Sequence, residues 1–256
     1  MITASHHMKT FALAATLTFA ASSGAATAQT GADGTLSLFA NGEALATEGF
    51  LAPELTRDGW ELRFDHVYVT LAGVSAFQTD PPYDAEAGGA PEAAVRVPFD
   101  MDAPMTIDLT DTGADGRVFL GEVAAPEGHY NAIAWSVVPA PSGDWTGHAM
   151  VLIGTAAKDG ESVAFTLTSS GTQDYVCGEY VGEERKGFVT ASGTADLELT
   201  FHLDHVFGRL DKGPEDAMNT GALGFDRFSG GGTQAINLDG LHIGHVGEGH
   251  CAVTHR

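Results

Sequence analysis

Alternating hydrophobic and polar positions dominate this chain and predict β-strands. In the most regular stretch, residues 195–206, one face is apolar and also carries His205, while the opposite face carries His202 and Asp204. Residues 61–67 alternate in the same way, and both stretches end in Asp-His-Val with the histidine on the apolar face. A period of two is the side-chain period of a strand. We therefore predict one strand for each stretch, with His66 and His205 in equivalent positions.

Short segments of the same kind recur along the chain, separated by clusters taken from its 33 glycines and 10 prolines. The further predicted strands are 35–39, 59–77 (one or two strands), 94–98, 105–109, 117–123, 131–138, 149–155, 162–168, 187–190 and 235–243. Pro214, followed by acidic residues, is the one good helix start. This spacing predicts a mostly β protein, an antiparallel β-sandwich (one large or two small) with at most one or two short helices.

The N-terminal residues have the pattern of a secretory signal peptide. In residues 8–28, a basic start at Lys9 is followed by a short apolar run and by the small-x-small exit Ala26-Thr27-Ala28. Residues 1–7, which include two histidines, are interpreted as a cloning remnant or an upstream start. No other segment is long and apolar enough to span a bilayer, so we expect a periplasmic or secreted protein without membrane insertion.

The remaining chain divides at a loop rich in proline and glycine, residues 139–147. We expect an N-terminal β-sandwich part over 29–140 and a C-terminal β part over 147–256, which carries most of the histidines. The alternative is one continuous domain.

Part of the N-terminal half resembles a known class of module. Residues 106–109 (Thr-Ile-Asp-Leu), Leu120-Gly121 and the turn Pro126-Glu-Gly-His-Tyr130 are similar to prealbumin-like or carboxypeptidase-regulatory-like β-sandwich modules of exported bacterial proteins. The resemblance covers residues 60–138. It implies a sandwich fold and a binding function, for a partner protein or a carbohydrate, without catalysis.

Charge and cysteine content narrow the function classes. The net charge is −22, which disfavours nucleic acid and anionic membranes as partners and attracts cations. The two cysteines, Cys177 and Cys251, are expected to form a disulfide in an exported protein. The alternative is a thiolate metal ligand, because Cys251 directly follows His250.

The clustering of histidines in the second half predicts a metal site. His202 and His205 share the spacing His-x-x-His with His242 and His245, and His250 follows closely. On a strand this spacing sends the two rings to opposite faces, whereas a helix or turn brings them to one side.

We therefore expect a site built across elements, from His66 and His205 together with His242 or His245. His202 and His250 are further candidate ligands, and Asp65 or Asp204 could support the ligands as hydrogen-bond acceptors.

Zinc is favoured as the metal because histidine and carboxylate ligands suit it. Copper is an alternative, since His148-x-Met150 lies on one face of a predicted strand, and iron is a third candidate.

Motifs of common enzymes are missing from the sequence: it has no Gly-x-Ser-x-Gly, phosphate-binding loop or dinucleotide fingerprint. We predict an exported transition-metal-binding protein for metal capture, delivery or sensing, with a membrane transporter or another periplasmic protein as partner. One alternative is a non-catalytic carbohydrate- or protein-binding module that uses Trp60, Trp135 and Trp145. The other is a metalloenzyme with an open coordination position.

Overall fold

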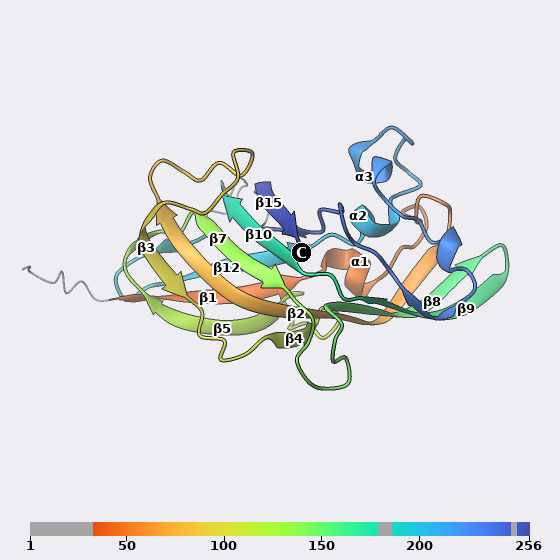
Figure 1. Ribbon diagram of the computed structural model, residues 1–256, viewed down its shortest axis with the longest axis horizontal. Helices are drawn as coiled ribbons and strands as arrows, with labels where there is room; N and C mark the ends of the chain where they lie inside the picture. The colour runs from red at the N-terminus through yellow and green to blue at the C-terminus, as the bar shows by residue number, and fades with distance from the viewer. Residues whose placement is uncertain (1–32, 179–185, 247–249) are drawn as a thin grey trace, which may run out of the picture. The chain divides into compact units, whose positions relative to one another are not determined.

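The computed structural model describes residues 33–178, 186–246 and 250–256, and the predicted signal peptide lies outside this part of the chain. Residues Gly31–Arg256 belong to one compact unit, in which strands predominate and helices are short (Figure 1). The prediction of a mostly β, sandwich-like fold is confirmed. The described residues contain three short α-helices and one 3-10 helix, more than the one or two expected.

The strands form a four-stranded and a nine-stranded sheet, with one small additional pair. The four-stranded sheet has the order β14 (Gly244–His245), β12 (Thr194–Phe201), β1 (Gly34–Asn41), β5 (Val118–Ala125). The nine-stranded sheet has the order β13 (Gly232–Ala235), β9 (Glu161–Ser169), β8 (Met150–Lys158), β2 (Glu61–Thr79), β7 (Ala132–Val137), β10 (Gln173–Gly178), β15 (His250–His255), and β3 (Ala93–Pro98) and β4 (Met105–Asp108) also pair with β2. The small pair is β6 (Gly128–His129) with β11 (Phe188–Val189).

Both large sheets combine strands from the two halves of the chain. β1 pairs in parallel with β12, and β2 pairs antiparallel with β8. Residues 139–147 form the connection between β7 and β8, two strands of one sheet. Side chains from both sheets meet in one hydrophobic core, so the two halves bury their apolar faces together.

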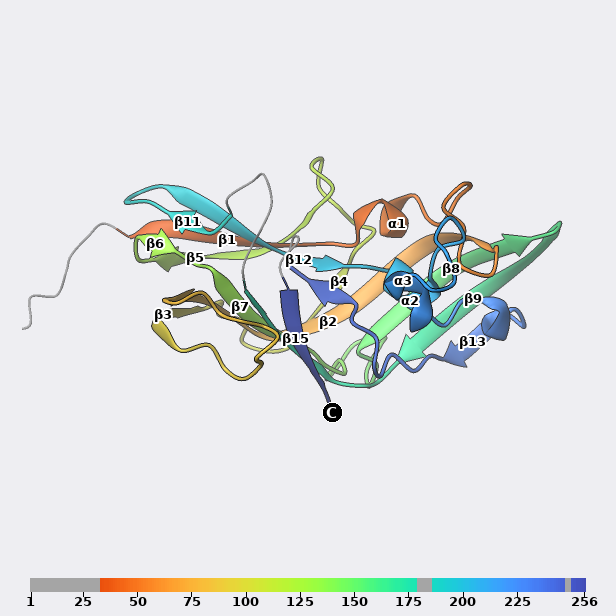
Figure 2. The ribbon, with the colours of Figure 1, turned by 90° about the horizontal axis from the view of Figure 1, so that it is seen from above.

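Short helical segments lie over the nine-stranded sheet near β8 and β9 (Figure 2). They are α1 (Glu43–Thr47), α2 (Asp204–Phe207), α3 (Ala217–Thr220) and η1 (Asp226–Phe228). A buried aromatic cluster fixes α2 there. The fully buried ring of Phe207 lies 5.7 Å from Phe50, 6.3 Å from Phe64 and 6.2 Å from Phe225, measured between centroids.

The predicted strand 195–206 is wrong beyond Phe201. β12 ends there, and the chain turns into α2. The reason lies in the apolar residues Leu203, Val206 and Phe207, which are all buried. Their spacing of three and four is helical, and this overrides the alternation that precedes it. Gly208, with a φ of 67°, then ends the helix in a conformation that suits glycine.

Two other predicted elements also differ from the structure. Residues 235–243 do not form a strand, because β13 ends at Ala235 and β14 begins at Gly244. The helix expected from Pro214 is shorter and starts at Ala217, where the Asp216 side chain accepts a hydrogen bond from the Met218 amide and caps it.

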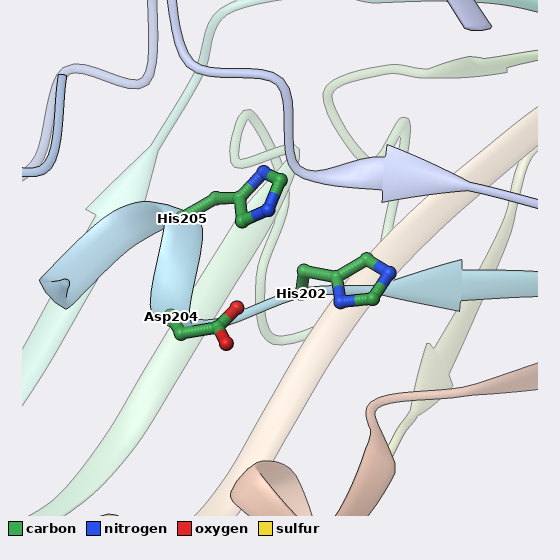
Figure 3. A group of neighbouring side chains, drawn as sticks. All are labelled: His202, Asp204 and His205. Atoms are coloured by element: carbon green, nitrogen blue, oxygen red, sulfur yellow. The ribbon is translucent and has the colours of Figure 1, made fainter. Parts of the chain in front are cut away.

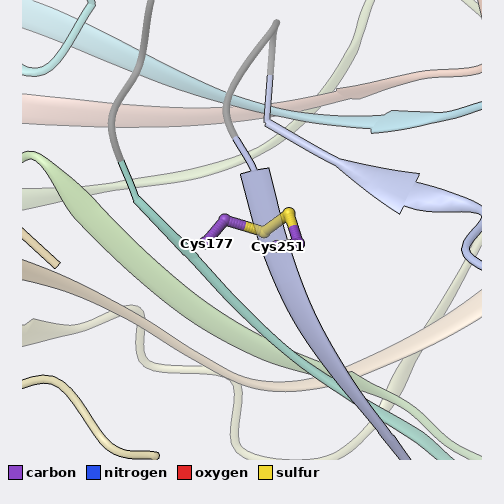
Figure 4. Close-up of a disulfide and its surroundings, with 2 residues drawn as sticks. All are labelled: Cys177 and Cys251. Atoms are coloured by element: carbon purple, nitrogen blue, oxygen red, sulfur yellow. A yellow bond between two sulfur atoms is a disulfide. The ribbon is translucent and has the colours of Figure 1, made fainter. Parts of the chain in front are cut away.

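The predicted disulfide is confirmed. Cys177 on β10 and Cys251 on β15 face each other across the antiparallel pair and are bonded (Figure 4). It ties the C-terminal strand to the sheet. Within the described residues, every helix is too short or too polar to cross a bilayer.

The position of α2 should depend on Phe207. Replacing this fully buried ring by alanine should lower the free energy of unfolding by about 3–5 kcal/mol, because the core loses apolar contacts and gains a cavity. Chemical denaturation measures the change. Phe119→Ala is the matched control: that ring is 57% exposed, and its loss should cost less than about 1 kcal/mol. Equal losses in the two variants would contradict this account of the core.

Candidate metal centre

The candidate site begins where β12 ends. His202 follows the strand, and Asp204 and His205 stand on the helical turn α2 on the same side (Figure 3). One ligand atom from each of these three residues lies within 4.8 Å of the other two. The change from strand to helix is what brings both rings of His202-x-x-His205 together, since a continued strand would separate them.

β14 adds a second pair of imidazoles. It pairs with the end of β12 so that His245 lies opposite Thr200. The His245 ring is 4.6 Å from His202 and 5.2 Å from His205, and His242 is 4.5 Å from His245, between ring centroids. The structure thus gathers both His-x-x-His pairs into one cluster.

Hydrogen bonds orient the rings on the Nδ1 side. His205 bonds through Nδ1 to the backbone carbonyl oxygen of His242. Because a carbonyl oxygen only accepts, Nδ1 is the donor of this bond, and Nε2 is not engaged by it. The Nδ1 of His202 lies 3.1 Å from a carboxylate oxygen of Glu43. Histidines that bind metals usually donate their other N–H to a carbonyl or carboxylate in this way.

Oδ1 of Asp204 and Nε2 of His245 are buried and make no hydrogen bond within the part of the chain that the structure describes. Asp204 is only 5% exposed. Burying such atoms without a partner is costly, and a bound ion would remove that cost.

The pKa values follow from burial and from the crowding of the rings. The pKa of His245 is lowered to about 3, first by burial and then by the charges of His202, His242 and His205. A hydrogen bond to the His242 backbone raises the pKa, but by less than these effects lower it. His245 is therefore neutral near pH 7 and can donate a lone pair to a metal.

His202 behaves differently because of its carboxylate neighbour. Burial lowers the pKa of His202. The hydrogen bond and charge of Glu43, together with the charge of Asp204, raise it by more than burial lowers it, so the pKa is raised overall. The same hydrogen bond lowers the pKa of Glu43 and keeps it ionised. A metal at His202 would take the place of the ring proton, with Glu43 still accepting from Nδ1.

The donor set fits a transition metal. Imidazole nitrogens with one carboxylate oxygen are ligands for zinc, copper and iron. Bonds of about 2 Å from one ion place two ligand atoms at most about 4 Å apart. The ligand atoms of His202, Asp204 and His205, all within 4.8 Å of one another, lie close to this separation.

His66 lies elsewhere, with its side chain 47% exposed and its Nδ1 2.6 Å from Asp108. The prediction that His66 sits on the apolar face of its strand is wrong. A β-bulge between Phe64 and His66 shifts the register, so that Val67 is buried instead. A one-residue slip exchanges the two faces of a strand. The predicted acceptor Asp65 lies at this bulge and is exposed, and Asp108 takes its place.

The remaining candidate ligands are not brought into the cluster by any described contact. Met150 is 1% exposed and packs in the hydrophobic core, and His148 precedes β8. The side chain of His250 lies outside the described residues. Cys251 is engaged in the disulfide, so it is not a thiolate ligand.

Glu43 was missed by the sequence analysis. It is far from His202 in the sequence, and nothing in its neighbourhood marks it. The parallel pairing of β1 with β12, which matches Asn41 with Thr200, carries Glu43 to the end of β12. Only knowledge of that pairing could have identified it.

Comparisons with known proteins gave no match: neither family models, curated proteins nor solved structures resemble the chain significantly.

Glu43 should strengthen metal binding by orienting His202. Glu43→Ala should weaken the affinity for a bound metal by about 10–100-fold, as the loss of such supporting groups generally does. Isothermal titration with zinc measures the change. Glu48→Ala, which removes the same charge from an exposed position at the end of α1, is the control and should bind as the wild type does. If both variants bound equally, Glu43 would have no orienting role.

Proposed function

We propose that this is an exported protein that binds a transition-metal ion through histidines, for metal capture, delivery or sensing. The observation that supports this best is the buried pair of Asp204 Oδ1 and His245 Nε2, which have no hydrogen-bond partner among the described residues. They lie close to His202 and His205, whose rings are held from the Nδ1 side. Such an arrangement is costly for a protein that binds nothing there.

Zinc is the metal that we favour for this site. His202, His205 and Asp204, with His245 beside them, would offer it three nitrogens and one oxygen, a donor set of the kind that zinc binds. Copper and iron accept the same donors. A competition experiment between the three metals would identify the one that the protein binds most tightly.

Export is supported by the disulfide, which persists in oxidising compartments, and by the signal-peptide pattern of residues 8–28. In the periplasm, the net charge of −22 would raise the local concentration of cations near the protein. Delivery would pass the ion to a membrane transporter or to another periplasmic protein.

The alternative of a carbohydrate-binding module is less well supported. Trp60 and Trp135 are 5% and 2% exposed, so of the three tryptophans only Trp145 is partly exposed. A row of exposed aromatic rings, which such a module would use to stack against sugars, is therefore not formed by them. The resemblance of residues 60–138 to exported β-sandwich binding modules remains a proposal.

Metal titration tests the proposed function. The mature chain, purified without a histidine tag, should bind one zinc or copper ion tightly. His205→Ala and His245→Ala should each weaken binding by at least about tenfold, since each removes a ligand. His66→Ala removes an exposed imidazole outside the cluster and should leave the affinity unchanged. Absence of stoichiometric binding, or equal effects of all three substitutions, would refute the proposal.

A further inference from the structure

A cavity of about 390 Å³ lies beside the histidine cluster. On one side it is lined by His205 and His242, and on the other by α3 and the adjoining residues, which include Asp216, Met218 and Gly221. The cavity therefore borders the cluster at His205 and His242. His202 contacts Glu43 of α1 instead.

The wall formed by α3 is held in place by hydrogen bonds to Arg57 and to the loop that follows α2. The Asn219 side chain donates to three backbone carbonyls, those of Arg209, Lys212 and Gly213. Arg57 in turn donates to the carbonyls of Asn219 and Ala222. Because Asn219 is buried and bonded on both sides, the residues before it have a defined position on the cavity.

Among the described residues that line the cavity, Met218 is the only one with a sulfur atom as donor. It is half-buried, on a short helix facing the cavity that His205 also borders. Asp216, the carboxylate of the same wall, already accepts a hydrogen bond from the Met218 amide. A thioether favours Cu(I) and is a poor ligand for zinc.

We propose that this cavity is the route by which a metal ion reaches and leaves the imidazoles, and that Met218 is a transit ligand for Cu(I) on that route. The inference rests on the proposed metal-binding function and specifies it further. The imidazoles determine the final affinity, whereas Met218 makes the exchange of Cu(I), and not of zinc, faster.

Exchange kinetics test this inference. Met218→Leu and Met218→Gln keep the approximate volume of the side chain and remove the sulfur. In transfer of Cu(I) from the loaded protein to a coloured chelator under anaerobic conditions, both variants should be slower by about tenfold, the scale on which supporting groups affect metal sites. Transfer of zinc should be unchanged. Met105→Leu, at a half-buried position on β4, is the matched control.

A second variant tests the route itself. Ala217 lines the cavity and is exposed, so Ala217→Trp should narrow the cavity and slow the exchange of both metals while the equilibrium affinity for zinc stays the same. Circular dichroism establishes that each variant is folded.

The outcomes separate the two proposals. If the wild-type protein binds zinc at the imidazoles but the Met218 variants exchange Cu(I) at the wild-type rate, the role of Met218 is refuted and the proposed function stands. If Ala217→Trp exchanges both metals at the wild-type rate, the cavity is not the route. If the wild-type protein binds neither metal, both proposals fall.

Discussion

Imidazole rings cannot share a small, partly buried volume as cations, and this constraint governs the site. Each protonated ring would raise the cost of protonating its neighbours, and burial adds to that cost. At His245 these two effects lower the pKa to about 3. His245 is therefore neutral near pH 7 and offers a lone pair, the form in which histidine binds metals. His202, whose pKa is raised, has the carboxylate of Glu43 beside it.

The fold meets this constraint with few elements. The parallel pairing of β1 and β12 sets Glu43 beside His202. The chain turns into α2, which Phe207 anchors in the aromatic cluster, and this turn places His205 close to His202. β14 adds His245 through its pairing with the end of β12. Each contribution comes from backbone pairing or core packing, which fixes the rings before any ion binds.

The sequence predicted the parts of this arrangement that depend on local patterns. The alternation of apolar and polar residues identified the β class. The presence of two cysteines in an expected exported protein identified the disulfide. The repeated His-x-x-His spacing identified four histidines that lie close together in the structure. It could not show that β12 ends at Phe201, because Leu203 fits both the alternation before it and the helical spacing after it. The bulge beside Asp65 has no signal in the alternation, so the equivalence of His66 and His205 did not hold. Glu43 depends on a long-range strand pairing that no local pattern encodes.

Anomalous diffraction from crystals of the zinc-loaded protein, recorded on both sides of the zinc absorption edge, tests the central claim most directly. The account predicts one strong anomalous peak at bonding distance, about 2.0–2.1 Å, from Nε2 of His202, His205 and His245. A peak at His66 or at another surface histidine, with the cluster rings bonded only to protein or water, would contradict it.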